Sequence, residues 1–273
     1  MVNHLKCSNS FDNPSSSHLF GNQSRYLIDQ AREQVKNSIN ALNSNEIIFT
    51  SGGTESNNLA IHGIIKLNLN NTIQPIEEIV KICRQYGSSD IIIHTNAWQS
   101  VGKVPIDVQQ LSVDLLTICS HKFHGPKGIG ALYIRQGIKL EPILYGAQHE
   151  QGLRPGTENV LAIIGLGKAC QLISNKLLLN KRIEQMKRTR DRLYQGLIQQ
   201  FNSHIIKRNG NEQSLPNTLS LSFHGINAKQ LVYQLRNHLA FSTGSACHED
   251  TKHQTMSTTL QAIGIISFSL SLK

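Results

Sequence analysis

The sequence predicts an α/β fold with a mostly parallel sheet, followed by a small α+β lobe. Short apolar runs alternate with helical segments through the first part of the chain, a pattern typical of parallel sheets with crossover helices. After residue 155 the chain reads as largely helical to residue 201, and a strand and a helix then follow. We therefore divide the chain into an α/β domain over 1–160 and, over 161–273, linking helices with the α+β lobe.

The individual elements follow from apolar spacing. Apolar residues at helical intervals predict a helix over 26–42, and a short apolar strand over 46–50 comes next. Further predicted elements are helices over 55–66, 76–86 and 227–239, and strands over 90–94, 115–118, 131–134 and 218–223.

Composition limits the classes of protein that fit. The 273 residues carry a formal net charge of +9, much of it between 176 and 192, where basic residues interleave with apolar ones at helical spacing. This pattern predicts an amphipathic helix with a solvated basic face, and no nucleic-acid motif accompanies it. No apolar run reaches membrane-spanning length, and the start lacks a signal pattern. Five widely spaced cysteines favour a reducing compartment, which we expect to be the cytosol.

A glycine turn after the strand at 46–50 predicts an anion site. The segment Ser51-Gly52-Gly53-Thr54 joins this strand to the next predicted helix. Glycines let backbone amides approach a ligand closely, and a helix N-terminus favours negative charge. A turn of this kind opens many helices, so by itself it identifies no ligand.

The strand at 115–118 ends at a polar cluster centred on Lys122. Gly-Pro and Gly-x-Gly punctuation follows it. Ligands of α/β proteins gather where strands end, and a lysine amine there can form a Schiff base with an aldehyde cofactor. The alternative for an isolated lysine is a solvated loop residue.

Five segments together resemble the selenocysteine lyase and cysteine desulfurase family, which belongs to the class-V aminotransferase-like, fold-type-I pyridoxal-phosphate (PLP) proteins. In chain order they begin at Asn13, Ser51, Ser120, Gly152 and Ser242 and read Asn-Pro-Ser-Ser-Ser-His, Ser-Gly-Gly-Thr-Glu-Ser-Asn-Asn, Ser-His-Lys-Phe-His-Gly-Pro-Lys-Gly, Gly-Leu-Arg-Pro-Gly-Thr-Glu-Asn and Ser-Thr-Gly-Ser-Ala-Cys. The resemblance implies PLP as the cofactor and a lyase that removes selenium or sulfur from selenocysteine or cysteine, leaving alanine.

The resemblance also assigns roles at the cofactor. Lys122 matches the lysine that binds the cofactor and shuttles the substrate proton. Gly53, Thr54 and His121 match positions at the cofactor phosphate. Thr157 matches a residue that reaches the phosphate of a neighbouring subunit, which implies a homodimer with composite sites.

Other matched positions surround the cofactor ring or the substrate. Gln99 matches a residue that hydrogen-bonds the ring oxygen, and Asn71 is a candidate contact. Cys119 stands where the family usually has Ser or Val. Cys247 matches the thiol that meets the departing atom, and the Cys-His-Glu-Asp run that starts there favours the selenocysteine lyase branch.

Three departures from the family pattern are expected to matter. Asn96 replaces an aspartate that pairs with the pyridine nitrogen. The segment between His62 and Gln74 is short and lacks a ring-stacking histidine, which predicts an incomplete sheet. The family's carboxylate-binding arginine near Ser269 is missing.

Two further readings stay open beside the lyase, and the departures favour only the first. One is a catalytically inactive or incomplete relative that at most binds PLP or a partner protein. The other is a structural zinc site built from Cys119, His121 and His124, or from the cluster that starts at Cys247, although neither has a paired ligand spacing. We expect no nucleic-acid or membrane partner.

Overall fold

The computed structural model describes residues 13–61, 73–88, 90–201, 204–210, 214–242 and 269–272. The chain divides into two compact units. Unit 1 comprises Met1–Asn68 and Pro75–Asn180, and unit 2 comprises Leu69–Gln74 and Lys181–Lys273. The division predicted from the sequence lies earlier, after residue 160.

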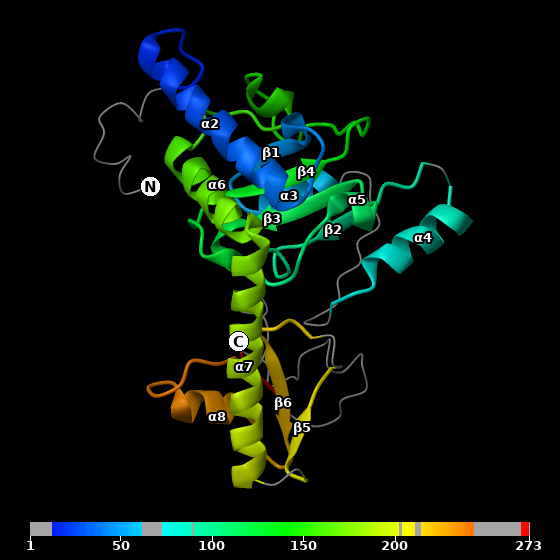
Figure 1. The fold of residues 1–273 in the computed structure, drawn as a ribbon, viewed down its shortest axis with the longest axis vertical. Coiled ribbons are helices and arrows are strands. Elements are labelled where there is room, and N and C mark those ends of the chain that lie inside the picture. The colour runs from blue at the N-terminus through cyan, green and yellow to red at the C-terminus, as the bar shows by residue number, and fades with distance from the viewer. Residues whose placement is uncertain are drawn as a thin grey trace. The chain divides into compact units, whose positions relative to one another are not determined.

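A four-stranded sheet forms the centre of unit 1 (Figure 1). Its strands are β1 (Ile47–Thr50), β2 (His94–Asn96), β3 (Leu115–Cys119) and β4 (Gly130–Ile134), in the order β1-β4-β3-β2. β4 pairs antiparallel with both β1 and β3, whereas β2 and β3 are parallel. The prediction of mostly parallel pairing is therefore wrong, and the sheet is mixed. The reason is local, because the ten residues between β3 and β4 are too few for a crossover.

Apolar composition explains why β1, β3 and β4 form. Every residue of these three strands is buried, as expected for a sheet covered on both faces. The predicted strand over 90–94 is wrong in position, since β2 begins at His94 and is only half-buried. Before it, the Ile93 amide donates to the Asp114 carboxylate at 2.7 Å, so a side chain takes the hydrogen bond that a ladder would need.

Two helices pack closely against each other in unit 1 (Figure 1). They are α2 (Leu19–Ser38) and α6 (Val160–Ser174). α2 begins earlier than predicted because the His18 ring caps it, accepting the Gly21 amide proton at 3.2 Å. Gly167 of α6 allows the contact, since a Cβ atom there would lie 2.7 Å from the Cα atom of Ala31.

The main core joins these helices to one face of the sheet. Its fully buried members include Val35, Ile39, Ile47, Ile118 and Leu166. A smaller cluster around Ile48, Leu59 and Leu132 packs α3 (Gly53–Ile61) on the opposite face. Unit 1 also contains α4 (Ile76–Tyr86), which has the predicted bounds, and the single turn α5 (Val108–Leu111).

Unit 2 contains a second, antiparallel sheet. Its strands β5 (Ile206–Arg208), β6 (Leu219–Phe223) and β7 (Ser269–Leu272) lie in that order, and α8 (Ala228–Leu235) follows β6. Ile206, Leu219 and Leu221 form its core with apolar residues of α7 (Lys176–Phe201). The predicted strand over 218–223 is confirmed, and the predicted helix over 227–239 is shorter than expected.

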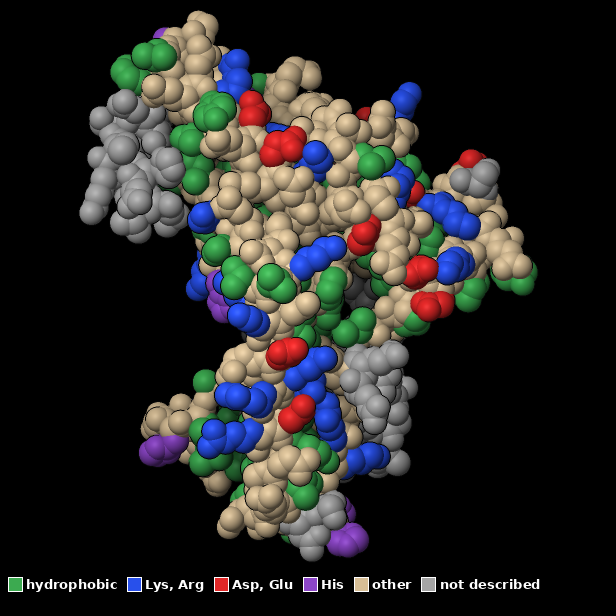
Figure 2. All heavy atoms as spheres, viewed as in Figure 1, with side chains coloured by type: hydrophobic (Ala, Val, Ile, Leu, Met, Phe, Trp, Pro, Cys, Tyr) green, Lys and Arg blue, Asp and Glu red, His purple; other side chains and the backbone are tan. Residues whose placement is uncertain are grey.

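The basic segment of the sequence lies on α7. Its exposed cations gather along this helix in Figure 2, and they are Lys176, Lys181, Arg182, Lys187, Arg188 and Arg192. The predicted solvated basic face is therefore confirmed. In the described part of the chain no single helix is long and apolar enough to cross a membrane. Among these residues, only the pair α6 and α7 has the length and composition of a membrane span, and the two helices are bent by 85° relative to each other.

Candidate active site

The candidate site lies at one edge of the four-stranded sheet. β1, β2 and β3 run in the same direction, because β1 and β3 both pair antiparallel with β4. Thr50 and Cys119, near the carboxyl ends of β1 and β3, both lie opposite Gly130. Asn96 at the end of β2 lies opposite Thr117. The segments that follow these three strands therefore meet at the edge where α/β proteins bind ligands.

The first segment is the glycine turn that opens α3. The helix begins at Gly53, and the Ser56 amide already donates to the Gly52 carbonyl at 3.1 Å. The turn lies against β4, since a Cβ atom on Gly130 would be 2.8 Å from the Gly52 carbonyl carbon. Thr54 is exposed in the first turn of the helix. This arrangement leaves a helix N-terminus facing the edge, where it favours an anion.

The second segment carries the lysine. β3 leads directly into the short 3-10 helix Ser120–Phe123, which contains Lys122. His124 ends this turn in the left-handed conformation, and Gly125 donates back to the Ser120 carbonyl at 3.0 Å. The backbone packs closely there, because a Cβ atom on Gly125 would lie 2.1 Å from the Ser120 hydroxyl oxygen and 3.1 Å from the Ser120 carbonyl oxygen. The turn therefore fixes the backbone from which Lys122 projects.

A single indole links the glycine turn to the lysine. The Lys122 ammonium lies over the Trp98 ring, 5.6 Å from its centroid. The same ring lies beside the glycine turn, since a Cβ atom on Gly53 would be 3.3 Å from Trp98 Cε3. The sequence analysis did not single out Trp98. The signal that could have found it is the only tryptophan of the chain, two residues after Asn96.

Cys119 lies beside the glycine turn and contacts His121. The Cys119 sulfur is 3.3 Å from Nδ1 of His121 and would be 3.5 Å from a Cβ atom on Gly53. Burial, together with the positive charges of Lys122 and Lys127, lowers the pKa of His121. The ring is therefore biased toward its neutral form, in which one nitrogen can accept a proton.

Asn96 is the last residue of β2 and Gln99 lies in the turn that follows, and both are half-buried. The Asn96 side-chain oxygen accepts the Trp98 amide proton at 3.3 Å. The backbone carbonyl of Gln99 accepts a hydrogen bond from the Lys103 ammonium at 2.8 Å. Asn96 and Gln99 thus lie on either side of Trp98 in the sequence, at the carboxyl end of β2.

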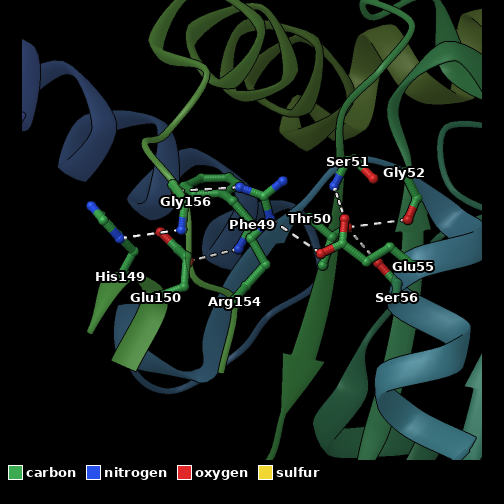
Figure 3. A network of polar contacts seen from close by, with 10 residues as sticks. All are labelled: Phe49, Thr50, Ser51, Gly52, Glu55, Ser56, His149, Glu150, Arg154 and Gly156. Atoms are coloured by element: carbon green, nitrogen blue, oxygen red, sulfur yellow. Dashed lines mark hydrogen bonds and ion pairs between the residues drawn. The ribbon is translucent and has the colours of Figure 1, made fainter. Parts of the chain in front are cut away.

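A network of hydrogen bonds and an ion pair connects the glycine turn to the loop that contains Arg154 (Figure 3). The Glu55 carboxylate accepts the Ser51 amide proton at 2.7 Å and pairs with Arg154 at 3.1 Å. Burial raises the pKa of Glu55, but the hydrogen bonds from Ser51 and the charge of Arg154 outweigh it and leave the pKa lowered. Arg154 also donates to the Gly156 carbonyl at 3.3 Å. The loop that contains the exposed Thr157 is thereby tied to the start of α3.

Several predicted positions thus lie at one edge, by contacts or by strand ends: Gly53, Thr54, Asn96, Gln99, Cys119, His121 and Lys122. Thr157 is near it in the loop held by Arg154. Asn71 and Cys247 lie outside the described residues. Within the described ranges, no group of three His, Cys, Asp or Glu residues is placed to hold a metal ion. The roles of these residues stay predictions.

Comparison with known proteins identifies the family. The chain matches the Aminotransferase class-V family over residues 4–71 and 66–273. The cysteine desulfurase IscS of Dictyoglomus turgidum is 36% identical over 303 residues, covering 87% of this chain and 75% of the relative. The IscS of Methanosarcina thermophila is 35% identical over 312 residues, covering 88% and 74%.

Solved structures agree with these relatives. A NifS-like protein superposes with a TM-score of 0.81 at 25% identity, covering 98% of this chain and 87% of the other. SspA in complex with cysteine gives a TM-score of 0.76 at 27% identity, covering 98% and 92%. Members of this family depend on PLP, and the structural neighbours share the fold-type-I architecture. The chain belongs to the class-V aminotransferase family, among relatives that are cysteine desulfurases.

Proposed function

We propose that the chain is a PLP-dependent lyase that removes sulfur from cysteine and leaves alanine. The observation that carries the proposal is that Lys122 and the N-terminus of α3 meet at one edge of the sheet, joined by contacts to one indole. The named relatives are cysteine desulfurases, and one structural neighbour is in complex with cysteine. We therefore propose cysteine as the substrate in preference to selenocysteine. The Cys247-His248 segment favours selenocysteine, but no named relative supports it.

The residues at this edge fit two ends of PLP. The α3 N-terminus and the adjacent His121 offer hydrogen-bond donors to a phosphate, and Gly53 leaves the approach open where a Cβ atom would crowd Cys119 at 3.2 Å. Lys122 offers the primary amine that an aldehyde needs. Thr54, exposed beside Gly53, is a further phosphate donor.

The side that faces the pyridine nitrogen fits less well. Asn96 offers an amide, whereas a carboxylate would carry the charge that pairs with a protonated ring nitrogen. Gln99, in the same turn, is the candidate donor to the ring oxygen. We expect these two amides to orient the ring while leaving its nitrogen weakly protonated.

Within this proposal the chain's own groups move protons and hold the leaving sulfur. PLP, when bound, supplies the electron sink for the substrate α-carbon. Lys122 takes the α-proton and later returns a proton to the product, as its position over the edge allows. Cys247 receives the departing sulfur as a persulfide, so that the carbon–sulfur bond of cysteine breaks and alanine remains.

A second candidate is a catalytically inactive relative that still binds PLP. Asn96 favours it, because an amide loses the charge-assisted hydrogen bond to the ring nitrogen, about 1.5–3 kcal/mol. This candidate predicts cofactor attachment at Lys122 without alanine production.

We further propose a homodimer in the cytosol. Thr157 is exposed in the loop held by Arg154, so it is free to face a second copy of the chain. The described cysteines Cys83, Cys119 and Cys170 are free, which supports a reducing compartment.

Absorbance spectroscopy, borohydride reduction and peptide mapping test the proposal. We expect visible absorbance on mixing with PLP and, after reduction, cofactor on the peptide that contains Lys122. Lys122→Ala should abolish attachment, whereas the matched control Lys127→Ala should keep it. Alanine production from cysteine, lost in Cys247→Ser, separates the lyase from the inactive relative. A folded protein that never attaches PLP would exclude both.

A further inference from the structure

We propose that Trp98 is the aromatic platform on which the ring of the bound cofactor stacks. The inference rests on the proposed function, since it needs a planar ring attached at Lys122. It concerns a residue to which the sequence analysis gave no role. Its basis is the position of one indole between the two groups that fit the ends of PLP.

The indole is in reach of both groups. Its centroid is 5.6 Å from the Lys122 ammonium, which lies over the ring face. Its Cε3 edge would be 3.3 Å from a Cβ atom on Gly53, at the N-terminus of α3. A ligand bound at the helix N-terminus and at Lys122 must therefore cross the space beside this indole.

The lysine determines which side of the indole the ligand meets. Lys122 approaches the face of Trp98, so a ring bonded to its nitrogen begins above that face. Aromatic rings favour offset-stacked or edge-to-face contacts, and a ring that lies above the indole face can form the offset stack, in which an electron-rich indole complements an electron-poor pyridine. We therefore infer stacking and not displacement of Trp98.

The backbone of Trp98 is held in place for this role. Its amide donates to the Asn96 side chain at 3.3 Å. The preceding Ala97 is buried and donates to the Thr117 carbonyl of β3 at 3.1 Å. Ala97 also accepts the Val101 amide proton at 3.0 Å, which closes the turn. Because this turn is already formed, ligand binding does not have to order its backbone, which lowers the entropic cost of binding.

The chain provides its own probe, because Trp98 is its only tryptophan. PLP titrated into the whole protein should quench tryptophan fluorescence in a saturable way. The quenching should follow attachment at Lys122, measured independently by borohydride reduction and mass spectrometry. N-acetyltryptophanamide in the same titration corrects for light absorbed by the cofactor.

Variants separate stacking from simple filling of space. Trp98→Phe keeps an aromatic face, and we expect PLP affinity within about threefold of the wild type. Trp98→Leu keeps an apolar side chain without a face and should weaken binding by about 3- to 10-fold. Equilibrium dialysis measures affinity, and circular dichroism with the urea midpoint verifies the fold. If Trp98→Leu fails to fold, the wild-type quenching and Trp98→Phe carry the test.

The outcomes distinguish this inference from the proposed function. Attachment at Lys122 without quenching, or equal or tighter binding by Trp98→Leu, would overturn stacking while the proposed function survives. Tighter binding in particular would mean that the indole obstructs the site. No attachment in the wild type or in either variant would overturn both.

Discussion

Arg32 and Glu150 form a two-pronged ion pair across 118 positions of the chain, with N–O distances of 2.6 and 2.8 Å. The Glu150 carboxylate also accepts the Phe49 amide proton of β1 at 2.7 Å, and the Arg32 guanidinium lies 4.7 Å from the Phe49 ring centroid. The Glu150 side chain is only 2% exposed. One buried pair thus fastens α2, β1 and the loop that leads to Arg154.

Removing one partner of this pair should be costly. Arg32→Leu leaves the Glu150 carboxylate buried without its charge partner, and we expect a loss of about 3–5 kcal/mol in the free energy of unfolding. Urea denaturation measures it. The matched control is Glu33→Gln, which breaks the more exposed pair with Lys36 and should cost less than about 1 kcal/mol. Equal losses in the two variants would contradict the assigned role of the buried pair.

Two helical glycines should respond to alanine with opposite signs. A Cβ atom on Gly167 would lie 2.7 Å from both Cα and Cβ of Ala31, so Gly167→Ala must push α2 away from α6. We expect a net loss of about 1 kcal/mol or more, since overpacking exceeds the gain in helix propensity. Gly196 of α7 has open space around its Cα, so Gly196→Ala should gain about 0.5–1 kcal/mol. Thermal unfolding measures both, and stabilisation by Gly167→Ala would refute the packing argument.

Strong local patterns made part of this structure predictable. The buried strands that end at Thr50, Cys119 and Ile134, the helix Ile76–Tyr86 and the turns around Gly53 and Lys122 all follow from apolar runs and glycines. The strand reversal at β4 could also have been predicted, because the lysine turn is too short for a crossover.

The rest depends on partners that are distant in sequence. The Asp114 carboxylate accepts the Ile93 amide proton, so β2 begins at His94, later than predicted. The His18 cap extends α2 at its start. The Lys122 contact with Trp98 joins two strand ends, and no local pattern encodes it. Such contacts become visible only when the strands are paired.

His121 should contribute to a loss of stability in mild acid. Burial, with the charges of Lys122 and Lys127, lowers its pKa below 6.5, so the unfolded chain binds the proton first. The contribution of His121 to stability is therefore present at neutral pH and falls as the pH drops below about 6.5. Urea midpoints between neutral pH and pH 5 should fall less in His121→Gln than in the wild type.

The charge of Lys127 offers a second check on the same residue. Lys127→Gln removes one of the two cations beside His121 and should raise the pKa of its ring, as read by NMR titration. The control is Lys139→Gln, which alters an exposed lysine that does not act on His121. Equal pKa values of His121 in the two variants would mean that the charge of Lys127 does not contribute to the lowering.

Asn96→Asp should strengthen the lyase reaction that we propose. The Asn96 oxygen already accepts the Trp98 amide proton, and an aspartate keeps that acceptor while adding a charge. A carboxylate there can pair with the protonated pyridine nitrogen, which is worth about 1.5–3 kcal/mol. We therefore expect alanine production from cysteine to rise about 10- to 100-fold.

The control for this gain is Asn180→Asp, which makes the same change on the exposed surface of α7 and should leave the rate unchanged. Rates are compared at saturating PLP, so that a difference in cofactor affinity does not enter. If Asn96→Asp attaches the cofactor at Lys122 but produces no more alanine than the wild type, the ring nitrogen is not paired at this position. The weak point of the site would then lie elsewhere.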